Sequence, residues 1–169
     1  TLGRSSTATQ QYSMALGVNS NAAGVGAIAI GSHSAGGTDK TSASGENSIA
    51  IGRFASARPL TATLGYTDPG SQIALGTNST AIAGSSIAIG NQATVLSPQF
   101  PDYLESTSIR SGIAIGGGQS YNGYSTQASL AGIAIGVGAR SINGNDTDPP
   151  LSDSIGPSIA IGYEAYSSN

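Results

Sequence analysis

The chain has 169 residues, a mass of 16.6 kDa and a formal net charge of −3, with 25 Gly, one His, one Met and neither Cys nor Trp. Only 9 % of its residues are charged, which excludes a charge-driven disordered chain, and six dispersed bases exclude a nucleic-acid binder. The missing Cys and single His exclude a disulfide scaffold, thiolate chemistry and a two-histidine metal site. With 5 % aromatic residues the core must be thin and built from small side chains.

An apolar-Ala-apolar-Gly tetrad recurs along the chain, and the step from Gly3 to Gly17 sets a base period of 14 residues. Each glycine is followed by a second short alternating segment, as in Val18-Asn19-Ser20-Asn21-Ala22. Two alternating segments around a glycine turn predict one solenoid coil per repeat, with two strands per coil. The clear tetrads are residues 14–17, 28–31, 49–52, 73–76, 87–90, 113–116, 133–136 and 159–162, with partial copies at 2–3 and 62–65.

These copies predict a single domain over residues 1–169 with about ten coils, truncated at both ends because the chain begins and stops inside a repeat. Insertions that depart from the base period are expected near 32–40, 98–109, 117–131 and 143–156. The register of the insertion near 117–131 is ambiguous from the sequence.

The first strand of each coil is apolar on both faces, which is typical of a strand buried on both sides. We expect its large side chains to form the coil core and its alanine to face outward, where another copy of the chain covers it. The alternative is that these alanines face solvent. The expected core is Met14, Leu16, Ile28, Ile30, Ile49, Ile51, Ile73, Leu75, Ile87, Ile89, Ile113, Ile115, Ile133, Ile135, Ile159 and Ile161, and the expected packing strip is Ala15, Ala29, Ala50, Ala74, Ala88, Ala114, Ala134 and Ala160.

Aromatic residues within the insertions are candidates for a partner surface, because aromatic side chains are good interface anchors. The candidates are Phe100, Tyr103, Tyr121 and Tyr124. The alternative is that they pack onto the chain's own coils or onto a neighbouring protomer.

Catalytic, metal and cofactor sites are not expected. Almost all the acids lie in turns or insertions, so the paired carboxylates that a glycan-cleaving solenoid needs on one strand face are absent. A Ca²⁺ ion at Asn145, Asp146 and Asp148 is conceivable, but a solvated turn is the simpler interpretation. An ice-binding solenoid needs a regular threonine array, which the second strands lack.

The repeats resemble the head of the YadA-like trimeric autotransporter adhesins of Gram-negative bacteria. The residues that carry the resemblance are Asn47-Ser48-Ile49-Ala50-Ile51-Gly52, Ser86-Ile87-Ala88-Ile89-Gly90 and Ser158-Ile159-Ala160-Ile161-Gly162. The resemblance implies an all-β, left-handed parallel β-roll that packs side by side as a homotrimer. It also implies a place on the bacterial surface, with membrane attachment only through a C-terminal outer-membrane domain absent here.

The function expected from this resemblance is non-catalytic attachment to host cells or to an extracellular matrix protein. The alternative is bacterial self-aggregation, or a structural spacer that presents other adhesive domains. The receptor does not follow from the sequence.

Overall fold

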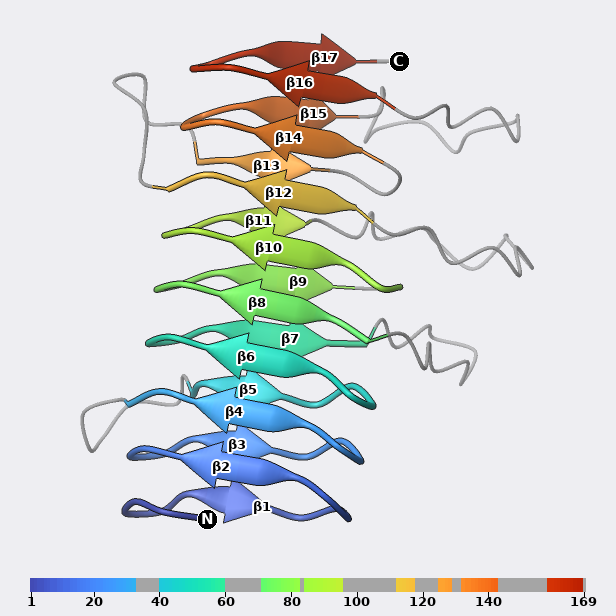
Figure 1. The fold of residues 1–169 in the computed structure, drawn as a ribbon. Helices are drawn as coiled ribbons and strands as arrows, with labels where there is room; N and C mark the ends of the chain where they lie inside the picture. Colours follow the sequence, from blue (N-terminus) through green and yellow to red (C-terminus); the bar gives the residue numbers. More distant parts are fainter. Residues whose placement is uncertain are drawn as a thin grey trace, which may run out of the picture.

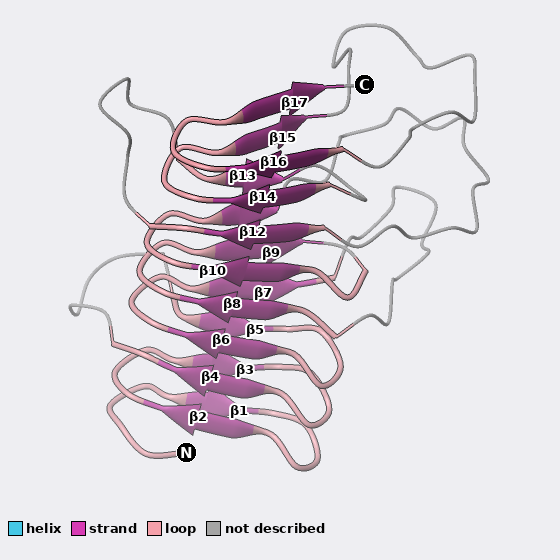
Figure 2. Ribbon diagram, turned by 45° about the horizontal axis from the view of Figure 1, so that its top comes forward, coloured by secondary structure: helices cyan, strands magenta, loops and turns pink. Residues whose placement is uncertain are grey.

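The computed structural model describes residues 1–32, 40–59, 71–82, 84–95, 112–117, 125–128, 132–142 and 158–168. These residues form an all-β roll of two parallel sheets that lie face to face (Figures 1 and 2). Each full coil contributes one short strand to each sheet, as the repeat predicts. A segment of two or three residues between turns is too short for a helix and long enough for one alternation of faces.

The first strands of the coils build an 8-stranded sheet, here called the isoleucine sheet. Equivalent residues stack in register, so that Ile87 pairs with Ile73 and Ile113, and Ala88 pairs with Ala74 and Ala114. Its strands are β2 (Met14–Leu16), β4 (Ile28–Ile30), β6 (Ile49–Ile51), β8 (Ile73–Leu75), β10 (Ile87–Ile89), β12 (Ile113–Ile115), β14 (Ile133–Ile135) and β16 (Ile159–Ile161).

The second strands build a 9-stranded sheet, here called the polar sheet after its outward residues. Its strands are β1 (Thr7–Ala8), β3 (Asn21–Ala22), β5 (Ser42–Ala43), β7 (Ser56–Arg58), β9 (Thr80–Ile82), β11 (Thr94–Val95), β13 (Gln127–Ala128), β15 (Arg140–Ile142) and β17 (Tyr166–Ser168).

The path of the chain is left-handed. In Figure 1 the isoleucine sheet is nearer the viewer and its arrows point left, whereas the arrows of the polar sheet behind it point right. Because the chain climbs from the N-terminal to the C-terminal coil along this path, the roll has the hand opposite to the usual parallel crossover.

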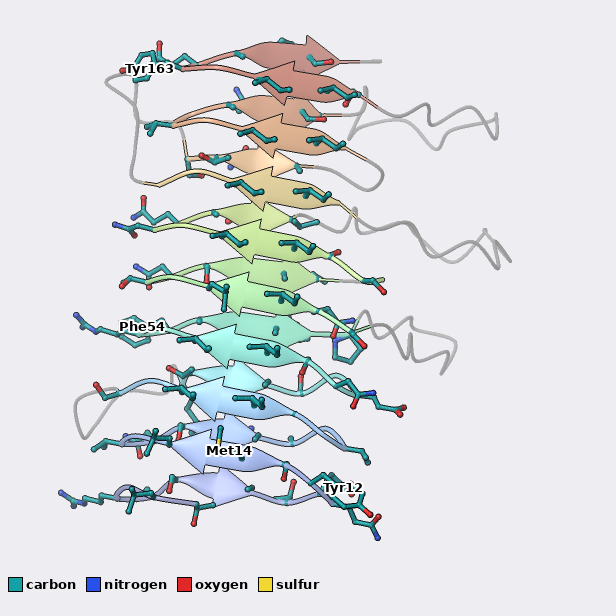
Figure 3. All side chains as sticks on the ribbon, in the orientation of Figure 1. Tyr12, Met14, Phe54 and Tyr163 are labelled. Carbon is teal, nitrogen blue, oxygen red and sulfur yellow. The ribbon has the colours of Figure 1, made fainter. Side chains whose placement is uncertain are left out.

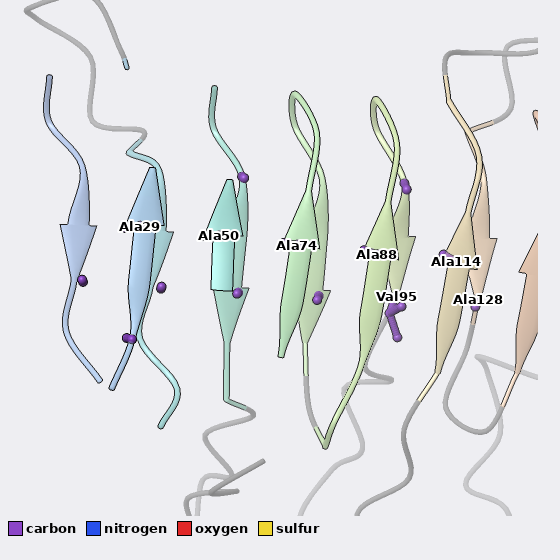
Figure 4. Packing of buried hydrophobic residues seen from close by; sticks show 14 of the residues in the cluster. Ala29, Ala50, Ala74, Ala88, Val95, Ala114 and Ala128 are labelled. Carbon is purple, nitrogen blue, oxygen red and sulfur yellow. The ribbon is translucent and has the colours of Figure 1, made fainter. Parts of the chain in front are cut away.

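The core corrects the expected assignment of faces. The alanine of every first strand is buried, from Ala15 at 1 % exposure through Ala88 at 0 % to Ala160 at 3 %, and faces the polar sheet (Figure 4). The large residues expected in the core point outward instead. The exposed fraction is 44 % at Met14, and the interior coils keep their isoleucines half-buried.

The thinness of the coil explains this reversal. Short turns close both ends of a coil, so the two sheets lie close together and leave room only for small side chains. Ala22, Ala43, Ala57 and Ala81 on the polar sheet are also fully buried and meet the alanines of the isoleucine sheet in this layer. An isoleucine column pointing inward would overfill it, and overpacking a core is destabilising.

A glycine column marks the turn that follows each strand of the isoleucine sheet. Gly90 has φ +126°, and a Cβ on it would collide with the carbonyl oxygen of Gly116 in the next coil. The second turn residue is also left-handed, as at Asn19 (φ 58°) and Asn78 (φ 56°). Glycine is therefore required at the column, because no other residue combines this φ with so close an approach of backbone to backbone.

The partial tetrad at 62–65 lies outside the described residues. Strand β6 pairs directly with β8, through Ile49 with Ile73 and Ile51 with Leu75, so no strand lies between them. The N-terminal partial copy does contribute, since Leu2 bridges to Leu16. The described residues therefore contribute nine strands to the polar sheet, and the expected total of about ten coils stays a prediction.

The described strand ends place the longer connections at two edges of the roll. Segments 33–39 and 118–124 connect the isoleucine sheet to the polar sheet, at one edge. Segments 60–70, 96–111 and 143–157 connect the polar sheet to the next isoleucine strand, at the other edge. Strand β13 settles the register near 117–131, because Gln127 pairs with Thr94 and Arg140.

Candidate functional site

The outer face of the isoleucine sheet is the most conspicuous surface of the roll. Two large aliphatic residues from each of its eight strands point away from the core and form two parallel columns, seen on the near sheet in Figure 3. With eight strands at about 4.8 Å per step, the columns run for roughly 33 Å along the roll. We call this surface the isoleucine face.

Exposure along the isoleucine face depends on position in the stack. The exposed fraction is 36 % at Ile115 in the interior, and it rises to 59 % at Ile159 and 67 % at Ile161 in the last coil. The neighbouring coils above and below cover an interior isoleucine, but among the described residues nothing covers its outer side. A continuous apolar strip of this kind is typical of an interface between protein chains.

The polar sheet has a different outer face. Its outward column is mainly hydroxyl and amide side chains, with Arg140 and Tyr166 at the C-terminal end. The outward column reads Thr7, Asn21, Ser42, Ser56, Thr80, Thr94, Gln127, Arg140 and Tyr166. The roll is therefore amphipathic across its thickness, with one face suited to a protein partner and the other to water.

Aromatic residues lie along the edges of the roll, where Tyr12 and Tyr163 are exposed and Phe54 is half-buried. Phe54 and Tyr163 lie at the edge that follows the isoleucine sheet, and Tyr12 lies at the other edge (Figure 3). The Arg53 guanidinium lies 4.6 Å from the centre of the Phe54 ring, and that of Arg140 lies 5.7 Å from the centre of the Tyr166 ring. These pairs hold aromatic and cationic groups together at the surface.

Acidic and metal-ligating side chains are sparse in the described part of the chain. Within the described ranges, no three His, Cys, Asp or Glu side chains gather where they could hold a metal ion. Glu46 and Glu164 are the two acids in these ranges, and they lie at turns in different coils. None of the described segments forms a helix of membrane-spanning length and hydropathy.

The sequence-predicted sites have different outcomes. The alanine strip cannot be the packing surface between copies, because its alanines are buried inside their own roll. The candidate partner residues Phe100, Tyr103, Tyr121 and Tyr124 lie outside the described residues. The isoleucine face was missed as a surface, although the small inward residues of the second strands were a signal that the core is thin.

A comparison with known protein families matches the chain to the YadA head domain repeat. The matched residues are 2–17, 8–34, 39–58 and 73–93, which cover the first coils of the roll. No curated protein and no solved structure matches the chain significantly.

Proposed function

We propose that this chain, which belongs to the YadA head domain family through the repeats matched between residues 2 and 93, is the adhesive head of a homotrimeric surface adhesin. Heads of this family are non-enzymatic, are trimeric in general and belong to autotransporter adhesins on the surface of Gram-negative bacteria. The finer proposal is that the head attaches to host cells or to an extracellular matrix protein. Its anchor would be a C-terminal outer-membrane domain outside this sequence.

The isoleucine face carries the proposal. Three copies that turn their isoleucine faces toward a common axis would cover both columns, and would leave the polar sheets and both edges in contact with water. Covering the exposed half of one isoleucine side chain stabilises the assembly by about 1 kcal/mol. Because the coils repeat this contact along the roll, these contributions accumulate from coil to coil.

The first test is the molar mass of the purified chain in solution by light scattering. A trimer has about 50 kDa, three times the 16.6 kDa of one chain. A monodisperse species of that mass supports the proposal. A monomer at every concentration tested contradicts packing through the isoleucine face.

The second test concerns attachment itself. The trimeric head is applied to immobilised collagen, fibronectin and laminin and to host cells, with the same chain after heat unfolding as the control. Saturable binding to a matrix protein or a cell surface supports the attachment role. Absence of binding throughout, with clumping retained by bacteria that display the head, rejects it in favour of self-aggregation.

Charge distribution favours self-aggregation as the second candidate function. The described coils hold five bases and two acids, whereas the segments between them hold seven acids and one base. A molecule whose opposite charges are segregated in this way attracts further copies of itself. The bases are Arg4, Lys40, Arg53, Arg58 and Arg140, and the acids between the described ranges are Asp39, Asp68, Asp102, Glu105, Asp146, Asp148 and Asp153.

A further inference from the structure

The third residue after each column glycine closes the glycine turn, and we call it the turn-closing residue. It is Ser or Ala in coils whose two strands are joined by that turn alone. Where it is Ser, its hydroxyl donates to the glycine carbonyl of the same turn. The distances are 3.0 Å from Ser20 Oγ to Gly17 O and 2.9 Å from Ser79 Oγ to Gly76 O. These bonds are local and join nothing beyond their own coil.

Two coils depart from this rule, and both contain a long connection at this edge. Thr41 follows segment 33–39 and Thr126 follows segment 118–124, each directly before its strand of the polar sheet. Each hydroxyl donates across to the next coil, at 2.7 Å from Thr41 Oγ1 to Gly52 O and 2.7 Å from Thr126 Oγ1 to Gly136 O. Their exposed fractions are 1 % and 0 %.

The backbone of the same two residues bonds to the preceding coil. The Asn21 amide donates to the Thr41 carbonyl at 2.8 Å, and the Thr94 amide donates to the Thr126 carbonyl at 2.9 Å. Each threonine is therefore tied to the coil below through its backbone and to the coil above through its side chain.

The column glycine that precedes each long connection leaves space for the threonine hydroxyl. Gly31 and Gly116 lack the left-handed φ of the other column glycines, and a Cβ on either would collide with the hydroxyl of Thr41 or Thr126. The coils whose glycine carbonyls accept these hydrogen bonds also differ from the serine-containing coils. Their turn-closing residues are Ala55 and Ala139, so no serine competes for the Gly52 or Gly136 carbonyl.

We propose that each threonine with its two glycines and the facing alanine forms an insertion-accepting site. Thr41 and Thr126 are its positioning residues, because they fix the point at which the chain re-enters the roll. An insertion at this edge can then change in length and sequence while the polar sheet keeps its register. The two sites lie four coils apart on one edge, about 19 Å, and therefore present two connections along the same line. The inference concerns the construction of the head and does not depend on what the head binds.

The first experiment compares Thr126→Val with Thr126→Ser, and uses Ser79→Ala as the matched change of a local bond. Valine keeps the shape and leaves the buried Gly136 carbonyl without its hydroxyl donor. We expect the melting temperature to fall by roughly 2–8 °C, with faster amide exchange at Gln127 and Ala128. Thr126→Ser should keep most of the melting temperature and most of the protection from amide exchange, because serine retains the hydroxyl. Ser79→Ala should leave exchange in β13 unchanged. Equal melting temperatures and exchange rates for the valine and serine variants would overturn the proposal.

The second experiment moves the site into a coil that lacks an insertion. Residues 76–79 are replaced by a copy of residues 31–41, which ends either in its threonine or in alanine. The recipient is suitable because the next coil has Ala93 at the turn-closing position, so no serine competes for the Gly90 carbonyl. We expect the threonine-ended version to melt several degrees higher than the alanine-ended one, and equal melting temperatures would contradict the proposal.

Discussion

The column glycines set the geometry of the roll at the scale of single residues. Most of them, Gly31 and Gly116 excepted, have a left-handed φ, and most also have no room for a Cβ beside the next coil. Three glycines allow the effect of φ to be distinguished from the effect of the close approach between coils. Gly90 combines φ +126° with a collision against the Gly116 carbonyl, Gly162 has φ +129° with its nearest neighbour at 3.8 Å, and Gly117 has neither constraint, with its nearest neighbour at 3.5 Å.

Alanine substitution at these three glycines should therefore give a graded series. We expect Gly117→Ala to be nearly neutral. Gly162→Ala should lose about 1–3 kcal/mol from backbone strain alone, and Gly90→Ala should lose more, because the coils must also move apart. The measurement is the free energy of unfolding from urea titration followed by circular dichroism. Equal losses at Gly90 and Gly162 would show that the close approach between coils carries no cost.

The glycine turns and the strand positions could be predicted from the sequence because they depend on local chemistry and on the repeat. The face that each strand turns inward does not follow from alternation alone. Alternation places Ile87 and Ile89 on one face and Ala88 on the other, but it does not say which face is inside. The volume between the sheets decides that, and it follows from how tightly both turns close the coil, which is a property of two strands together.

At the scale of elements, the two sheets have opposite roles although their strands have similar lengths. The isoleucine sheet combines a small inner column with a large apolar outer column. The polar sheet combines the same small inner column with a hydrophilic outer one. Fold stability within one chain depends on the inner columns, whereas association depends on the outer column of the isoleucine sheet.

Changing the outer column should therefore uncouple association from folding. We expect Ile87→Ser with Ile89→Ser in β10 to lower the fraction of trimer at least tenfold at micromolar protein, because each copy loses apolar area at the proposed axis. The inner alanines are untouched, so the β-sheet circular dichroism should persist. Light scattering measures the mass.

The matched control for this pair lies on the polar sheet. Thr80→Ser with Thr94→Ser changes two outward residues of neighbouring strands, and we expect no loss of trimer. If this control dissociates the assembly and the isoleucine variant does not, the copies pack through the polar sheet instead.

The insertions mark the limit of element prediction. The repeat located each clear tetrad, whereas the direct pairing of β6 with β8 does not follow from it. The strand at Gln127 lies within the expected insertion near 117–131, and its register follows from its pairing with Thr94 and Arg140. Such pairings connect residues far apart in the chain, so a local pattern does not reveal them.

At the scale of the whole molecule, stacked coils behave as a quasi-one-dimensional array in which each coil meets its neighbours alone. Regular coils present a uniform isoleucine face, and the departures from the 14-residue period lie in the connections at the two edges. The acids follow this division, since the described coils hold Glu46 and Glu164 and the remaining seven acids lie in the segments between the described ranges. The head is thus a weakly basic roll with acidic connections.

This division predicts that association between heads depends on salt. At about 20 mM salt the screening length exceeds 20 Å, and it shortens to a few ångströms near 0.5 M. We expect sedimentation velocity to show trimers joining into larger species at low salt and separating at high salt. The variant Asp146→Asn, Asp148→Asn and Asp153→Asn should abolish the larger species, because it removes three of the acids that would attract the bases of a second head. Asn143→Ser with Asn145→Ser, in the same segment and without charge change, should retain them. Larger species that persist unchanged in high salt would instead indicate apolar association through exposed ends such as Ile159 and Ile161, which the charge variant would leave intact.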